Sequence, residues 1–185
     1  MNRLKGHSVY LVSPIDDCPE GGKTWREYFG NFLKSLEIGV FDPTKKPLDI
    51  IDETLDNVAY IKNLKKAGDY TRVRNIMRKI VAADLHCCDL ANFIVAFLDL
   101  NLAMCGTISE ITFASLQKKP VIIICPQGKA AVPSWLFGLG LKHEMFFETF
   151  DDAENYIKHI AFDEKIDDLG RWRFIDYNKV FNENK

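Results

Sequence analysis

Two continuous apolar runs dominate the hydrophobic pattern of the chain, at residues 93–98 and 121–125. Short runs of this kind are typical of parallel strands that are covered on both faces. Residues 108–117 between them can form a helix, and Pro120 ends it because proline cannot continue a helix. The pattern therefore predicts two neighbouring buried strands that are joined through a helix.

A turn at Cys105-Gly106-Thr107 is predicted between the first of these strands and the helix. Its glycine allows the backbone to approach a ligand closely. Glu110 then falls in the first turn of the helix, near the carboxyl end of a parallel strand. Open α/β sheets bind their ligands at such ends, so this stretch is the first candidate for a functional site.

The rest of the chain shows the same alternation of strand and helix patterns. Residues 8–13 and 38–41 are short apolar strands, and residues 24–36 between them have apolar positions at helical spacing. A strand, a helix and a second strand in this order begin a βαβ unit. Five further elements are predicted: a short helix within 48–61, a longer helix at 70–88, a helix start at 133–135, a strand at 145–148, and a closing helix at 150–162 with Asp151 as its cap.

These elements predict one α/β domain over residues 1–162, large enough to bury a core. Residues 163–185 form a polar tail that contains Trp172, Phe174, Ile175, Tyr177 and Phe181. We expect so aromatic a tail to dock on its own domain or on a neighbouring subunit.

Charge and cysteine content exclude several classes of protein. The net charge is −2, which does not favour a nucleic-acid partner. The five cysteines are odd in number and lack the CxxC spacing, so we expect reduced thiols, a cytoplasmic setting and no cysteine-based metal site. No apolar run is long enough to span a membrane, and residues 1–6 do not resemble a signal peptide.

A cluster of lysines and arginines at residues 62–79 stands out in this slightly acidic chain. It is either a solvated helix face or a site for a phosphate, a nucleic acid or an acidic partner surface.

Motifs for several kinds of chemistry are missing from the sequence. It holds no phosphate-binding loop with a lysine, no GxGxxG after the first strand and no Gly-x-Ser-x-Gly elbow, and its four histidines are scattered. The carboxylates Asp84 and Glu110 are the remaining candidates, and paired carboxylates can cleave a glycosidic bond. Each also has a structural explanation, since the helix dipole favours a glutamate in a first turn and Asp84 could be an ordinary helical residue.

Five segments together resemble the nucleoside 2-deoxyribosyltransferase family and its relatives, the deoxynucleotide N-glycoside hydrolases. They are Tyr10-Leu11-Val12-Ser13-Pro14, the helix that ends near Asp84, the central apolar strand, Cys105-Gly106-Thr107-Ile108-Ser109-Glu110-Ile111, and Lys119-Pro120-Val121-Ile122. The resemblance covers residues 8–126 and extends more loosely to 162. It implies a flavodoxin-like three-layer sandwich with a five-stranded, mostly parallel sheet.

The resemblance also implies a role for each matching residue. Glu110 matches the nucleophile that attacks C1′ of the sugar, Asp84 matches the aspartate that binds or protonates the base, and Tyr10 matches a tyrosine that contacts the nucleophile. The substrate-binding positions that it implies are Ser13, Pro14, Asp16, Asp99, Met104, Gly106, Thr107 and Trp135.

One departure from the family pattern lies in the same stretch. Met104 stands where the family often has an aspartate, two positions before the glycine, and Asp99 or Asp16 could take over its contact with the sugar or base. The asparagine that a neighbouring subunit supplies in the family has no clear match, and Trp135 falls in that region.

The predicted function is cleavage of the N-glycosidic bond of a 2′-deoxynucleoside or its 5′-monophosphate, with transfer of the sugar to another base, as in nucleotide salvage. The predicted partners are a nucleoside or nucleotide and a free base, with no cofactor or metal, in a homo-oligomer. Two alternatives stay open: an N-glycoside hydrolase of a nucleotide or NAD, and a non-catalytic nucleotide-binding regulatory protein.

Overall fold

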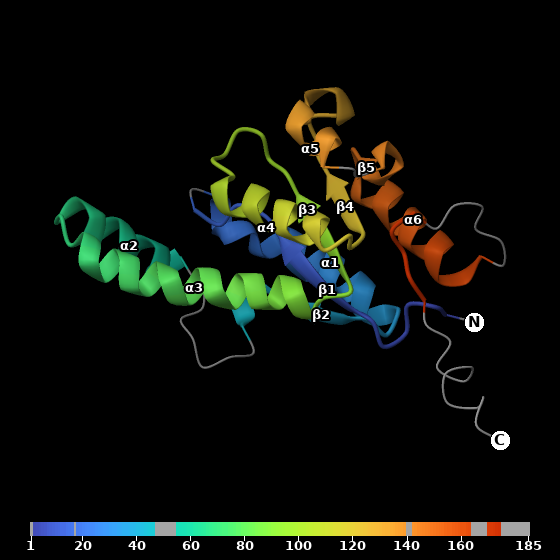
Figure 1. Ribbon diagram of the computed structural model, residues 1–185, viewed down its shortest axis with the longest axis horizontal. Helices are drawn as coiled ribbons and strands as arrows, with labels where there is room; N and C mark the ends of the chain where they lie inside the picture. Colours follow the sequence, from blue (N-terminus) through green and yellow to red (C-terminus); the bar gives the residue numbers. More distant parts are fainter. Residues whose placement is uncertain (1, 17, 47–54, 140–141, 164–169, 175–185) are drawn as a thin grey trace, which may run out of the picture.

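The sheet at the centre of the molecule is five-stranded and parallel throughout, as Figure 1 shows for the computed structural model. The structure describes residues 2–16, 18–46, 55–139, 142–163 and 170–174. The strand order is β2-β1-β3-β4-β5. The strands are β1 (Ser8–Val12), β2 (Gly39–Phe41), β3 (Phe93–Phe97), β4 (Val121–Ile124) and β5 (Phe146–Phe147). The order reverses at β1, whose neighbours are β2 on one side and β3 on the other, so the ends of β1 and β3 form a switch point for ligand binding.

Helices cover both faces of the sheet, so the predicted three-layer sandwich is confirmed (Figure 1). Val9 and Leu11 of β1 pack with α1 (Lys23–Ser35) and α6 (Phe150–Phe162). Tyr10 and Val12 point to the other face, towards α3 (Tyr70–Leu90) and α4 (Cys105–Leu116). The two-residue period of the strand therefore decides which side chains of β1 reach which layer. The other α-helices in the described part of the chain are α2 (Leu55–Lys66) and α5 (Ser134–Gly138).

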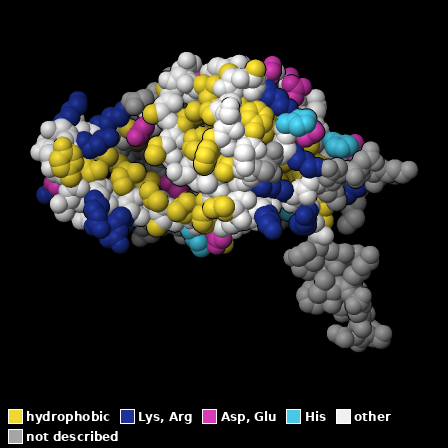
Figure 2. All heavy atoms as spheres, turned by 45° about the horizontal axis from the view of Figure 1, so that its top comes forward, with side chains coloured by type: hydrophobic (Ala, Val, Ile, Leu, Met, Phe, Trp, Pro, Cys, Tyr) yellow, Lys and Arg dark blue, Asp and Glu magenta, His cyan; other side chains and the backbone are white. Residues whose placement is uncertain are grey.

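Helices α2 and α3 lie side by side and extend beyond the end of the sheet (Figure 1). Figure 2 shows lysine and arginine side chains next to apolar ones at this end of the molecule. The predicted basic cluster lies here, and Arg72, Arg74, Arg78 and Lys79 are exposed on α3. The part of the predicted helix 48–61 that precedes α2 is outside the described residues. None of the helices in the described part of the chain has the length and apolar character needed to cross a membrane.

The predicted turn at residues 105–107 is wrong, because these residues form the first turn of α4. The helix begins directly after Met104, whose carbonyl accepts a hydrogen bond from the Ile108 N–H at 2.9 Å. Gly106 is exposed, and a Cβ at this position would meet no atom within 4 Å. Glu110 consequently lies in the second turn of α4 rather than in the first.

The predicted cap of α6 is also wrong. Thr149 is the N-cap, and its hydroxyl accepts a hydrogen bond from the Asp152 N–H at 3.1 Å. Asp151 lies inside the first turn of the helix, where a negative charge is favoured by the exposed N–H groups. Threonine and aspartate are both common caps, so composition alone did not separate them.

The described residues 170–174 pack on the α/β domain of their own chain. Trp172 is buried, its ring centroid lies 5.0 Å from that of Phe93, and its indole N–H donates to the Tyr156 hydroxyl at 2.9 Å. Arg171 donates to the Leu139 carbonyl at 3.0 Å and to the Ser115 hydroxyl at 3.1 Å.

The loop after β1 is held by Arg26, a fully buried cation on α1. Its guanidinium donates to the Gly21 carbonyl at 2.8 Å and to the Ser13 carbonyl at 3.0 Å, and its Nε lies 3.9 Å from Asp42. Gly22 makes this packing possible, because a Cβ there would lie 2.7 Å from Arg26 Nη1 and its φ is +70°. A guanidinium suits this place because its several N–H groups lie in a fixed plane.

We expect Arg26→Met to lower the free energy of unfolding by about 3 kcal/mol, because two or more buried carbonyls lose a charged donor. Denaturant unfolding followed by circular dichroism measures this change. Arg72→Met is the matched control, since Arg72 is exposed on α3 and pairs with Asp69 at the surface, and its expected loss is below about 1 kcal/mol. Equal losses in the two variants would contradict the role of Arg26.

A second pair of variants separates backbone strain from contact at Gly22. Gly22→Ala and Gly6→Ala both place an L side chain at a positive φ, which costs roughly 1–2 kcal/mol. Only at Gly22 does the new Cβ also meet Arg26, whereas nothing lies within 4 Å at Gly6. Unfolding measurements should therefore show a clearly larger loss for Gly22→Ala, and a difference near zero would argue against tight packing of this loop.

Candidate active site

Tyr10 and Glu110 meet at the middle of β1. Tyr10 is buried on the face of the sheet that α3 and α4 cover, and its hydroxyl donates to Glu110 Oε1 at 2.9 Å. The two residues are 100 positions apart in sequence, and the second turn of α4 brings Glu110 over β1. The structure thus places two of the predicted catalytic residues in direct contact.

The hydroxyl of Tyr10 is held in its neutral form. Burial raises its pKa well above the usual value, and the negative charges of Glu110 and Asp84 raise it further. A neutral phenol donates a hydrogen bond to a carboxylate, so Tyr10 can orient Glu110 without placing a second negative charge beside it.

Asp84 belongs to the same group of side chains. It is buried on α3, and its charge and that of Glu110 both raise the pKa of Tyr10. Its Oδ1 lies 3.0 Å from Nζ of Lys46, whose side chain has 0% exposure. Lys46 follows a short 3-10 helix (Pro43–Lys45) after β2, so three chain segments converge on this point.

Lys46 was missed by the sequence analysis. It stands in Thr44-Lys45-Lys46, a stretch of the kind that normally lies in solvent. The available signal was Asp42-Pro43, which ends β2 and places the following residues at the carboxyl edge of the sheet. That signal predicts where Lys46 lies in the fold, but it does not predict that the side chain is buried.

Two thiols line the same cluster from α3. Burial, Asp84 and Glu110 raise the pKa of Cys87, and the same three influences raise that of Cys88. Because thiolates and not thiols are nucleophiles, neither cysteine is suited to covalent chemistry here. The carboxylates of Glu110 and Asp84 remain as candidate nucleophiles in the cluster.

Ser13 and Pro14 are buried at the end of β1. The Ser13 hydroxyl accepts a hydrogen bond from the indole N–H of Trp25 at 3.0 Å, and its carbonyl accepts one from Arg26. These contacts hold the loop in place. Asp16 lies farther along the loop and is exposed.

The other predicted substrate-binding residues are spread over several elements. Asp99, after β3, accepts hydrogen bonds from the side chains of Gln127 and Asn101, each at 2.9 Å. Met104 is half-buried against the α3 and α4 side of the core, and Thr107 is buried in α4. Trp135 is 72% exposed on α5.

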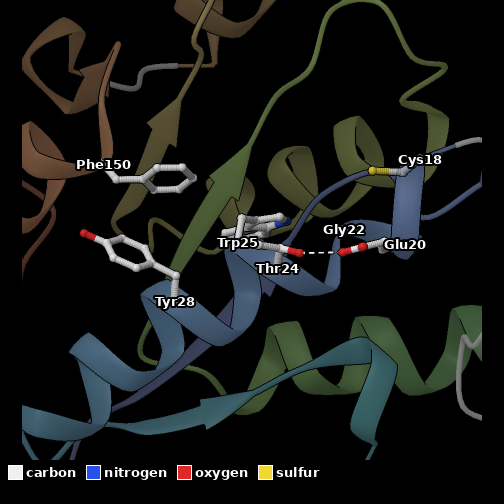
Figure 3. A pocket seen from close by; sticks show the side chains of 7 residues that line it. All are labelled: Cys18, Glu20, Gly22, Thr24, Trp25, Tyr28 and Phe150. Carbon is white, nitrogen blue, oxygen red and sulfur yellow. Dashed lines mark hydrogen bonds between the residues drawn. The ribbon is translucent and has the colours of Figure 1, made fainter.

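An aromatic groove lies on the opposite face of the sheet and was not predicted. It has a volume of about 560 Å³ and runs between α1 and the start of α6, where the rings of Trp25, Tyr28 and Phe150 face it (Figure 3). Trp25 stacks on Phe97 at the end of β3, with centroids 5.4 Å apart. The remaining lining residues are Cys18, Glu20, Gly22 and Thr24.

The two regions offer different chemistry. The cluster of Tyr10, Glu110, Asp84 and Lys46 joins two carboxylates, a neutral phenol and an ammonium, which can supply a nucleophile and charge stabilisation. The aromatic groove is apolar and offers stacking surfaces. Within the described residues, no group of three or more histidine, cysteine, aspartate or glutamate side chains is arranged to hold a metal ion.

Similar folds occur among solved structures. No family model and no curated sequence matches the chain. A 2-deoxyribosyltransferase from the psychrotolerant bacterium Bacillus psychrosaccharolyticus is 19% identical, with 80% of this chain and 91% of that chain covered and a TM-score of 0.53. A CMP N-glycosidase from Clostridium botulinum is 14% identical, with 83% of this chain and 99% of that chain covered and a TM-score of 0.50. At these identities the likeness is one of fold, and it confirms the fold class expected from the sequence.

The raised pKa of Tyr10 predicts how stability depends on pH. Its pKa in the folded state lies above the unfolded value of about 10, so the unfolded chain binds fewer protons above that pH and stability falls. Tyr10→Phe removes this contribution. Between about pH 10 and 11.5 the free energy of unfolding of the wild type should therefore fall more steeply than that of the variant, by up to roughly 1.4 kcal/mol per pH unit.

Chemical denaturation at a series of pH values measures both curves. Tyr60→Phe is the control, since Tyr60 is half-exposed on α2, and its curve should follow the wild type. Parallel curves for Tyr10→Phe and wild type would show that the Tyr10 environment is not as described.

Proposed function

We propose that this chain is a nucleoside 2-deoxyribosyltransferase-like enzyme that cleaves the N-glycosidic bond of a 2′-deoxynucleoside or its 5′-monophosphate. The observation that carries the proposal is the hydrogen bond from Tyr10 to the half-buried Glu110, beside the buried carboxylate of Asp84. A carboxylate oriented by a tyrosine hydroxyl near the carboxyl edge of a parallel sheet is well placed to attack a sugar carbon.

The first step forms a bond between a Glu110 carboxylate oxygen and C1′ of the sugar. The bond from C1′ to the base nitrogen breaks, and its electron pair leaves with the base, which then takes up a proton. Asp84 binds the base or mediates that protonation, while Tyr10 keeps Glu110 oriented. In the second step an incoming base attacks C1′ and releases Glu110, which completes the transfer.

The solved structures support this proposal at the level of the fold and of the chemistry that they are named for. One is described as a 2-deoxyribosyltransferase and the other as a CMP N-glycosidase. Both names concern the bond between a sugar and a base. The second name also favours a specific alternative, in which water replaces the incoming base and a nucleoside monophosphate is hydrolysed.

A homo-oligomer is part of the proposal. Leu116 at the end of α4 and Trp135 on α5 are 75% and 72% exposed, which leaves large apolar side chains available for a second copy. Exposed apolar side chains of this size are common at protein–protein contacts.

We expect Glu110→Gln to lower the rate of base exchange by several powers of ten, on the order of 4–8 kcal/mol of barrier, because the amide cannot attack C1′. The assay mixes the protein with a deoxynucleoside or its monophosphate and a second free base, and follows the new nucleoside by chromatography. Glu144→Gln is the control, since Glu144 is exposed near β5, and it should leave the rate unchanged.

Mass spectrometry of the intact protein during turnover tests the intermediate directly. A covalent sugar adduct should form on the wild type and be missing from Glu110→Gln. Release of free base without a new nucleoside would identify the hydrolytic alternative. Failure of the wild type to act on nucleosides and on their monophosphates would refute the proposed function.

A further inference from the structure

Lys46 is a buried cation, and the steps of the proposed reaction described above give it no role. Its side chain has 0% exposure, and its ammonium lies 3.0 Å from Asp84 Oδ1. Removing a lysine from water is costly unless an opposite charge compensates for the loss of hydration. The Asp84 side chain, itself only 12% exposed, supplies that charge. The ion pair is therefore a buried part of the cluster and not a surface contact.

Asp84 and Glu110 exert an electrostatic influence on the same neighbouring side chains. The negative charges of both raise the pKa of Tyr10 on β1, and both raise the pKa of Cys88 on α3. Two carboxylates that lie close together disfavour each other's ionisation. A proton on Glu110 would prevent its attack on a sugar carbon.

We propose that Lys46 is the counter-charge that allows Asp84 and Glu110 to be ionised together near neutral pH. Lys46 is a positioning residue in this account, because it contacts Asp84 and acts on Glu110 through the charge balance of the cluster. The kinetic part of the inference rests on the proposed function. The ionisation of the two carboxylates is a property of the folded chain and can be measured without a substrate.

Tyr10, Cys87, Cys88 and Lys119, the other titratable groups described at the cluster, do not supply a positive charge to its carboxylates. Tyr10 and the two thiols of Cys87 and Cys88 are neutral when protonated, and their pKa values are raised. Lys119 lies beside Cys88, but its ammonium donates to the Cys88 and Asp89 carbonyls at 2.6 and 2.5 Å. Lys46, by contrast, places its ammonium directly against a carboxylate of the cluster, that of Asp84.

The first test is the pH dependence of kcat/KM for the wild type, Lys46→Met and Lys46→Arg. Methionine keeps the length and apolar stem of lysine but has no charge. In Lys46→Met the acidic limb of the profile of kcat/KM against pH should move to higher pH by about one unit or more, which is a tenfold loss of rate at a given pH on that limb. In Lys46→Arg the acidic limb should stay at the wild-type pH. A uniform loss of rate at every pH, with the limb unmoved, would show a merely structural role and overturn the proposal.

The second test needs no activity. Carbon-13 NMR follows the carboxyl carbons of Glu110 and Asp84 as the pH changes, with assignments from Glu110→Gln and Asp84→Asn. The Glu110 titration should move to higher pH in Lys46→Met and return towards the wild-type value in Lys46→Met/Asp84→Asn, because that variant has lost one charge of each sign. If Lys46→Met does not fold, Asp84→Asn is compared with the double variant, and Glu110 should titrate at lower pH where Lys46 is present.

The two tests separate the inference from the proposed function. Unmoved carboxyl titrations in an active enzyme would overturn the role of Lys46 and leave the proposed function standing. Moved titrations in a protein that acts on no nucleoside or nucleotide would refute the proposed function and support the charge balance.

Discussion

A buried charge is stable only when other charges or hydrogen-bonding groups replace the water that it has lost, and this constraint shapes the carboxyl edge of the sheet. Arg26 and Lys46 are both nearly fully buried there. Arg26 is compensated by carbonyls of the loop after β1, and Lys46 by the Asp84 carboxylate on α3. Each cation can be buried only if its loop takes one conformation. Electrostatic contacts therefore hold the loop after β1 and the described residues 42–46 after β2.

The geometry of the sheet then decides which side chains share the site. Successive residues of β1 point to opposite faces, so Tyr10 reaches α3 and α4 whereas Val9 and Leu11 pack on the other side. Helix α4 begins at Cys105, and its second turn carries Glu110 back to the Tyr10 hydroxyl. A helix that began three residues later, as the sequence pattern suggested, would present a different face towards β1. The contact between Tyr10 and Glu110 thus depends on the residue at which α4 begins.

The same strand separates two environments. On the α3 and α4 side, two carboxylates, a phenol and an ammonium lie together, with neutral thiols beside them. On the α1 side, the aromatic groove holds Trp25, Tyr28 and Phe150 in an apolar setting. Ser13 and Arg26 tie the loop between these regions to α1. The division concentrates charge chemistry on one face and stacking surfaces on the other.

Local patterns in the sequence determined the elements, because strand and helix periods depend on neighbouring residues. The strands at 93–97 and 121–124 and the helices at 70–90 and 150–162 follow from such patterns, and the resemblance to a known family singled out Tyr10, Asp84 and Glu110 from the sequence alone. The start of α4 and the cap of α6 were mistaken, since several residue types can begin a helix and the choice is made by packing. Lys46 and the aromatic groove became visible only in the tertiary structure. Burial and charge pairing join segments that are distant in sequence, and no local pattern records which lysine will meet which carboxylate.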